Sequence, residues 1–208
     1  MVTRLEGGFL STNATNVELM CSLASLQLAT HPTTRIVCID GPAGSGKTTL
    51  AQQLAESLSA QTVHMDDLYA GWTGLVQGTE ILVEKVLTPL AQGTAGSYHR
   101  YDWVADHYAE AHVVPPAQWL VVEGCASATT QVDKFSPFII WVEAGDSTRL
   151  ERGLARDGEH LRPQWLAFMR DEAAVYLANN TSARAHVRLD GFGNIVGGSA
   201  LGNQGGNQ

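Results

Sequence analysis

Apolar residues form two kinds of pattern along this chain of 208 residues. Short continuous apolar runs are typical of strands that are buried on both faces, and apolar residues that return every three or four positions indicate helices. We expect strands at residues 36–39, 62–65, 119–122, 138–142 and 187–189, the last at an edge of the sheet. We expect helices at residues 17–29, 49–59, 79–92, 147–156 and 163–179.

The alternation of strands and helices predicts an α/β fold with a mostly parallel sheet and helices on both of its faces. The length suits one domain, which we place at residues 1–192. Residues 93–116 are aromatic and charged but show no clean period, so we assign no regular element to them. Residues 193–208 are rich in Gly, Asn and Gln and poor in apolar side chains, which predicts a disordered tail.

A glycine-rich motif follows the first expected strand. Residues 41–48 read GPAGSGKT, which fits the P-loop pattern G-x-x-x-x-G-K-[ST]. Between a strand and a helix, the backbone N–H groups of such a loop converge on one point, so the motif predicts a nucleoside triphosphate site. Lys47 would supply a cation for the β- and γ-phosphates, and the Thr48 hydroxyl a ligand for Mg²⁺. The residues expected to bind the nucleotide are Gly41, Ala43, Gly44, Ser45, Gly46, Lys47, Thr48 and Thr49.

Carboxylates follow three of the other expected strands. In an open α/β sheet, ligands gather beyond the carboxyl ends of the strands, where Asp66, Asp67, Glu123 and Glu143 stand. Asp66 is the candidate base that takes a proton from an acceptor hydroxyl, since it would face Lys47 across the phosphates. The alternative is that Asp66 or Asp67 caps the following turn. Glu123 has a Walker-B-like position and is expected to hold Mg²⁺ through a water or to orient Asp66.

Three arginines share one face of an expected helix. Arg149, Arg152 and Arg156 stand at i, i+3 and i+7. With Gly158 close behind, they predict a lid at about residues 149–162 whose cations contact the phosphates. The alternative is a solvated face that pairs with neighbouring acids.

Aromatic and polar side chains are densest at residues 98–103, which read Tyr-His-Arg-Tyr-Asp-Trp, with His107 close by. Rings with a few polar groups are what a small-molecule pocket requires. The alternative is a structured surface loop. Trp72 and Trp119 are instead expected to pack in the core.

These pieces occur in an order that resembles the uridine kinase and phosphoribulokinase branch of the P-loop kinases, over most of residues 35–190. The P-loop alone is shared by many families, whereas Asp-Asp-Leu-Tyr joined to Glu-Gly and an arginine-bearing lid is much more selective. The matching segments are residues 41–49, 65–69, 101–103, 121–124 and 147–157.

The resemblance implies a nucleoside monophosphate kinase-like fold in three layers, with a five-stranded sheet in the order 2-3-1-4-5 and an arginine-bearing lid. It implies that ATP or GTP donates its γ-phosphate to a nucleoside 5′-hydroxyl or another small alcohol, with Asp66 as the base and Arg152 and Arg156 as lid cations. One departure is that Asp106 stands where uridine kinases usually carry a histidine that helps to read the pyrimidine, with His107 one residue later. The residues expected to bind the acceptor are Asp66, Tyr69, Tyr101, Asp102 and His107.

Composition narrows the choice of partners. The net charge is −8, so the chain lacks the excess of basic residues that is typical of a nucleic-acid binder. No apolar stretch approaches the roughly 18 residues of a membrane span. Cys21, Cys38 and Cys125 show no metal-ligand spacing, and such an odd, unpaired set fits a reducing cytosol. We therefore expect a cytoplasmic protein that binds no nucleic acid and no membrane, with homo-oligomer formation left open.

The leading hypothesis is a kinase that uses ATP and Mg²⁺ and phosphorylates uridine or cytidine. Two alternatives stay open: the same reaction on pantothenate, a sugar or another metabolite alcohol, and a nucleotide-binding regulator without catalysis. Asp66 distinguishes these classes, because only a kinase needs a base at that position.

Overall fold

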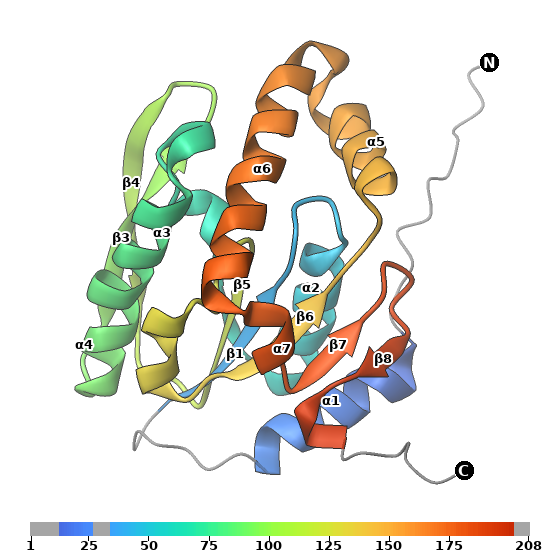
Figure 1. The fold of residues 1–208 in the computed structure, drawn as a ribbon. Coiled ribbons are helices and arrows are strands. Elements are labelled where there is room, and N and C mark those ends of the chain that lie inside the picture. The colour runs from blue at the N-terminus through green and yellow to red at the C-terminus, as the bar shows by residue number, and fades with distance from the viewer. Residues whose placement is uncertain (1–12, 27–33, 202–208) are drawn as a thin grey trace, which may run out of the picture.

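The computed structural model describes residues 13–26 and 34–201, which are built around a six-stranded sheet (Figure 1). Its order is β2-β5-β1-β6-β7-β8, with β8 antiparallel and the other pairs parallel. The five parallel strands have the expected order 2-3-1-4-5 when they are counted along the chain, but the expected total of five is wrong. The strands are β1 (Arg35–Asp40), β2 (Gln61–His64), β5 (Trp119–Glu123), β6 (Phe138–Val142), β7 (Val187–Leu189) and β8 (Ile195–Gly197).

The sixth strand lies in the segment for which the sequence predicts disorder. β8 pairs with β7, so β7 is not an edge strand, and a 3₁₀ turn at Ser199–Leu201 follows it. The amides of Ser199 and Ala200 donate to the carbonyls of residues 185 and 186 at 3.2 and 3.0 Å. Backbone pairing of this kind needs no apolar side chains, which is why the composition misleads here. The rest of the expected tail, residues 202–208, lies outside the described residues.

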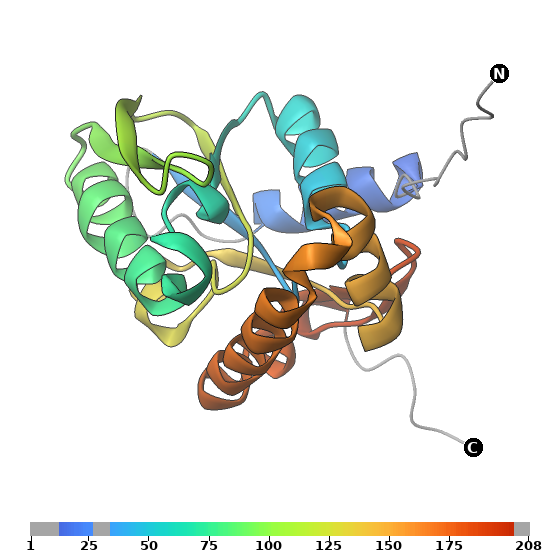
Figure 2. The ribbon, with the colours of Figure 1, turned by 90° about the horizontal axis from the view of Figure 1, so that it is seen from above.

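Helices cover both faces of the sheet, which gives the three expected layers (Figures 1 and 2). α1 and α2 pack on one face, and the helical segments α3, α4 and α6 on the other. Among the residues that the structure describes, no helix is both long and apolar enough to cross a membrane. The helices are α1 (Ala14–Leu26), α2 (Lys47–Leu58), α3 (Leu75–Ile81), α4 (Thr88–Ala91), α5 (Asp146–Asp157), α6 (Arg162–Asn179) and α7 (Thr181–Arg184).

Two of these helices differ from their expected bounds. α1 begins at Ala14 because the Asn13 side chain accepts the N–H of Thr15 at 3.1 Å, and residues 27–29 of its expected range lie outside the described residues. The helix expected at residues 79–92 is a continuous run from α3 to α4 whose middle, Leu82–Leu87, is π-helical. Pro89 has no N–H to donate to the preceding turn, which fits this widening.

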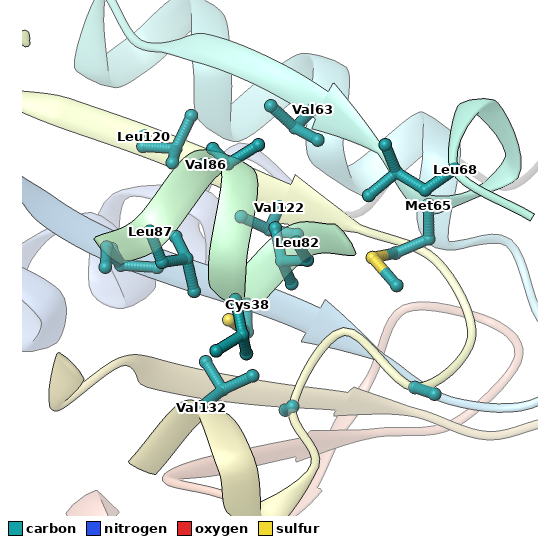
Figure 3. Close-up of a cluster of buried hydrophobic side chains, with 14 of the residues drawn as sticks. Cys38, Val63, Met65, Leu68, Leu82, Val86, Leu87, Leu120, Val122 and Val132 are labelled. Carbon is teal, nitrogen blue, oxygen red and sulfur yellow. The ribbon is translucent and has the colours of Figure 1, made fainter. Parts of the chain in front are cut away.

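The sheet divides the core in two. Successive residues of β1 point to opposite faces, so Ile36 and Cys38 join one buried cluster while Val37 and Ile39 join the other. Both faces are apolar, which explains why the strands read as continuous runs. Figure 3 shows the first cluster, where Cys38, Leu120 and Val122 of the strands meet Leu82, Val86 and Leu87 of the helical run.

Residues 93–116, to which the sequence analysis assigns no element, form a separate antiparallel hairpin. Its strands are β3 (Gly96–Asp102) and β4 (His107–Val114). The pairing shifts register between His99 and Tyr101, so the buried rings of Tyr98 and Tyr101 are three positions apart rather than two. That bulge breaks the alternation by which a strand is recognised.

The first strand ends in a buried carboxylate. Asp40 is fully buried and accepts the N–H groups of Gly41, Ala126 and Ala128 at 2.7 to 2.9 Å. The Tyr176 hydroxyl of α6 donates to it as well, at 3.2 Å. Asp40 therefore ties the end of β1 to the loop that follows β5, and this junction fixes where the glycine-rich loop begins.

Burial raises the pKa of Asp40 from 3.8 to about 6, against the effect of its hydrogen bonds. Between these values the folded protein keeps a proton that the unfolded chain has lost, so the contribution of Asp40 to the free energy of unfolding falls as the pH rises. From pH 4 to pH 7 we expect wild type to lose about 2 kcal/mol more than Asp40→Asn, which cannot titrate. Urea denaturation of both proteins measures this, and parallel pH profiles would contradict it.

Candidate active site

The glycine-rich loop joins β1 to α2 in a conformation that two of its glycines make possible. Gly41 has φ +142°, and a Cβ there would lie 2.0 Å from the carbonyl oxygen of Val142 on β6. Gly44 has φ +78°, and its Cβ would lie 2.7 Å from the carbonyl oxygen of Arg149 on α5. The loop is thus held close to its neighbours, with α2 starting at Lys47, as the P-loop interpretation requires.

Lys47 is buried at the foot of this loop. Its ammonium donates to the carbonyls of Gly41 and Pro42 at 2.7 and 2.9 Å. Burial lowers its pKa, but the neighbouring Cys125 and the carboxylates near it outweigh that effect, so the pKa of Lys47 is raised and the group stays charged. The Ser45 hydroxyl is buried without a hydrogen-bond partner, which leaves a free polar atom in the loop for an anionic ligand.

The two expected metal ligands lie together. The Thr48 hydroxyl donates to Glu123, with 3.3 and 3.4 Å to its two carboxylate oxygens. On the other side, the His64 ring nitrogen Nδ1 lies 2.6 Å from Glu123 Oε1, and this hydrogen bond raises the pKa of His64. A hydroxyl and a carboxylate are oxygen ligands of the kind that Mg²⁺ prefers, so the residues fit the metal.

Asp66 and Asp67 lie in the 3₁₀ turn Met65–Asp67 that follows β2. The Asp66 side chain is exposed to solvent within the cleft that it shares with Lys47. Desolvation by the surrounding protein, together with the charge of Glu123, nevertheless raises the pKa of Asp66. The indole N–H of Trp103 donates to the Asp66 backbone carbonyl at 2.9 Å, which joins the hairpin to this turn. The geometry leaves the Asp66 carboxylate accessible and able to accept a proton.

The loop, the turn and the hairpin enclose one cleft of about 610 Å³. That volume suits a small organic molecule. Its aromatic wall is centred on Trp72, whose ring centroid lies 5.7 Å from that of Trp103 and 5.9 Å from those of Trp165 and Phe168. Trp72 therefore lines the cleft and does not only pack in the core, whereas Trp119 is buried in the core as expected. The aromatic residues that line the cleft are Tyr69, Trp72, Tyr101, Trp103, Trp165 and Phe168.

The three arginines of α5 do not act as one surface. Arg149 is buried and ion-paired with Asp146 and Glu172, so it supports the fold rather than facing the cleft. Arg152 and Arg156 line the cleft, and Arg156 is paired with Asp157 at 2.6 Å, as the alternative of a face that pairs with neighbouring acids expects. Arg152 donates to the carbonyl of Gly44 at 3.2 Å, and Arg156 lies over the ring of Trp165 at 5.9 Å.

Glu172 joins the P-loop to α5. This side chain of α6 is only 1% exposed. One carboxylate oxygen accepts the N–H of Ala43 at 2.8 Å and lies 3.4 Å from the Cys125 thiol, while the other accepts from Arg149 at 2.6 Å. The buried carboxylate of Glu172 thus holds the P-loop, the loop after β5 and α5 in fixed relative positions.

The tyrosines expected at the acceptor both line the cleft, but their hydroxyls are engaged. Tyr69 is buried and donates its hydroxyl hydrogen bond to the carbonyl of Cys125. Tyr101 donates to the Asp106 carboxylate, so the residue that replaces the expected histidine holds a ring of the wall. These contacts present the tyrosine rings, rather than their hydroxyls, to a ligand.

Asp102 and His107 are not among the residues that line the cleft. The Asp102 carboxylate accepts the N–H groups of Val104 and Ala105, which holds the tip of the hairpin and the pKa of Asp102 below its ordinary value. His107 is exposed at the start of β4. Glu143 also lies elsewhere, where it accepts from the indole of Trp141.

Sequence reasoning missed His64, Glu172 and Trp165. The last two share a stripe: Trp165, Phe168 and Glu172 stand at i, i+3 and i+7 of α6, and all are buried. An acid within an apolar stripe is a sign of a paired internal charge, and it could have pointed to Glu172. No pattern pointed to His64, because its partner lies 59 residues away.

Comparison with known proteins agrees with this geometry. A family profile described as an AAA domain matches residues 37–176. No curated protein matches the chain by sequence. The structure is similar to that of a protein described as a possible uridine kinase from Bacillus stearothermophilus, with 19% identity, a TM-score of 0.63, and 85% of this chain and 98% of that one covered. It is also similar to D-glycerate 3-kinase from Cryptococcus neoformans, with 14% identity, a TM-score of 0.54, and coverage of 92% and 98%. At these identities the likeness shows the fold, which is that of P-loop kinases.

Replacing the buried carboxylate tests its role in holding the loop. Glu172→Gln leaves Arg149 without its fully buried partner, so we expect a loss of about 3 kcal/mol in the free energy of unfolding, measured by urea denaturation. Glu159→Gln, which breaks an exposed ion pair with Arg162, is the matched control and should change stability little. Equal effects of the two substitutions would contradict this role of Glu172.

Proposed function

Because the chain belongs to the AAA domain family and has the fold of P-loop kinases, we propose that it is an ATP-dependent kinase that transfers the γ-phosphate to a hydroxyl group of a small molecule. The observation that carries the proposal is the shared cleft, where Lys47 and Thr48 of the P-loop face Asp66. A nucleotide-binding regulator would need the first two residues but no carboxylate opposite them.

Each residue has a role that follows from its surroundings. The P-loop amides and Lys47 bind the phosphates of ATP, while Arg152 and Arg156 stand along the cleft wall to stabilise the charge of the transferred group. Asp66 accepts the proton of the acceptor hydroxyl, since its raised pKa makes it a better base than an ordinary aspartate. Thr48 and Glu123 would hold Mg²⁺, which when bound neutralises charge on the phosphates.

Uridine and cytidine are the first acceptors to test. The resemblance of residues 65–69 and 121–124 to uridine kinases supports them, as does the aromatic wall, on which a base can stack. Pantothenate, a sugar or another metabolite alcohol is the alternative, and the likeness to a D-glycerate kinase supports keeping it.

The test is ADP release from ATP–Mg²⁺ across a panel of nucleosides, vitamins, sugars and hydroxy acids. If no acceptor increases ADP release, the result would favour a regulator. If another acceptor increases it but uridine and cytidine do not, the result would favour the alternative.

Lys47→Ala should weaken ATP binding by about tenfold or more, because the variant loses the ammonium that is held at the foot of the loop. Titration with ATP followed by calorimetry measures the change. Lys85→Ala, which removes an exposed lysine of the helical run on the other side of the sheet, is the control. Unchanged affinity in Lys47→Ala would count against the P-loop as the nucleotide site.

Asp66→Asn should keep ATP affinity near that of wild type and lower kcat by roughly 10² to 10⁴, because the amide cannot accept the proton. Steady-state ADP release with the best acceptor measures kcat. Asp171→Asn, an exposed acid of α6, should leave kcat unchanged. A near-normal rate in Asp66→Asn would remove Asp66 from the mechanism.

A further inference from the structure

The acceptor end of the cleft has an unusual balance of charge. The cations at the P-loop end, Lys47 and Arg152, stand where the phosphates of ATP would bind. Among the described residues that line the acceptor end, Asp66 and Asp67 form no ion pair, and the cations near them are Arg100 and Arg156. Arg156 is already paired with Asp157 at 2.6 Å. The sign of the electrostatic potential at this end therefore depends on whether Arg100 is paired with other carboxylates.

Arg100 is already paired. Its Nε and Nη2 atoms donate to the two carboxylate oxygens of Glu110 at 2.6 and 3.2 Å, and Nη2 also donates to Asp102 at 3.4 Å. A two-pronged contact of this kind fixes the guanidinium on the hairpin and engages its donors. Two carboxylates for one guanidinium leave no surplus positive charge on this part of the hairpin.

Asp67 is held in place at the same end. The Asp67 carboxylate interacts with the Tyr98 hydroxyl, and the Tyr98 ring is buried and stacked on His112, with 5.4 Å between the ring centroids. The Asp67 carboxylate thus lies against the hairpin. Together with Asp66 it gives the acceptor end a negative character, against the aromatic wall of Trp72 and Trp103.

We propose that the acceptor is an alcohol without negative charge, and that Asp67 is the specificity-determining residue that excludes anionic alcohols. The inference rests on the proposed kinase function and names the substrate class of the same cleft. An anionic group seated here would meet two carboxylates, and the two arginines near it, Arg100 and Arg156, are already paired with Glu110 and Asp157. Like charges brought together in a partly enclosed site oppose binding. A neutral molecule with a flat face can pack on the rings without that cost.

Matched pairs of acceptors test the proposal, each pair presenting the same hydroxyl with and without a negative charge. The pairs are uridine and uridine 3′-monophosphate, an N-alkyl pantothenamide and pantothenate, and glyceramide and glycerate. With the full chain and ATP–Mg²⁺, we expect kcat/KM to be at least about tenfold higher for the neutral member of any pair that reacts. An equal or higher value for the anionic member would overturn the proposal.

The variant Asp67→Asn keeps the shape of the side chain and its contact with Tyr98 but removes the charge. It should reduce the neutral-to-anionic ratio by about tenfold, whereas Glu18→Gln, which removes a charge on the exposed side of α1, should leave the ratio unchanged. Glu110→Gln is a second variant, which frees Arg100 and should improve kcat/KM for the anionic members. Ratios that stay at the wild-type value in both Asp67→Asn and Glu110→Gln would remove these residues from specificity.

A binding measurement separates this proposal from the proposed function. Quenching of tryptophan fluorescence reports occupancy of the cleft, since three of the five tryptophans of the chain line it. If no compound is phosphorylated but the neutral members quench more strongly than their anionic partners, the charge preference stands and the kinase function fails. If no neutral member quenches, or if the anionic members quench as strongly, the charge preference is overturned whatever the activity.

Discussion

The buried carboxylate of Glu172 contacts the P-loop, α5 and the loop that follows β5. A charge at 1% exposure is tolerated only when its oxygens are satisfied, and here a backbone N–H and a guanidinium satisfy them. Any movement of α6 away from the P-loop would leave that charge unpaired. The positions of Ala43 and Arg149 are consequently fixed by the same requirement that keeps the core intact.

Asp40 imposes a similar constraint at the start of the loop. It collects N–H groups from the P-loop and from residues 126 and 128, so the floor of the cleft is built on hydrogen bonds rather than on apolar packing alone. The donor half of the site is thus held by two internal carboxylates, 40 and 172. The acceptor half is held differently, by ring contacts around Trp72 and by the bond from Trp103 to the turn at Asp66.

Much of this arrangement could be predicted from the sequence, for identifiable reasons. The parallel strands are apolar on both faces, and the P-loop motif fixes the junction of β1 and α2, so the donor half follows from local pattern. The hairpin was missed because its bulge between His99 and Tyr101 breaks the period and because much of β4 is exposed. Glu172 contacts Ala43, which lies 129 residues away in the sequence, and His64 contacts Glu123, which lies 59 residues away. No local pattern encodes such pairs. The helix that carries the three arginines was predicted, whereas the pairing of Arg149 with α6 could not be, because it depends on the packing of two helices.

The hairpin of β3 and β4 hydrogen-bonds with no strand of the central sheet and forms a two-stranded sheet of its own. Its strands can therefore change without altering the backbone pairing of the parallel sheet, although Tyr98 and Val114 pack in the core cluster on one face of that sheet. This separation makes the fold modular: one half can be inherited unchanged while the other diverges. New substrates can be accommodated by changing those positions within 96–114 that line the cleft, while the P-loop that binds the triphosphate stays as it is.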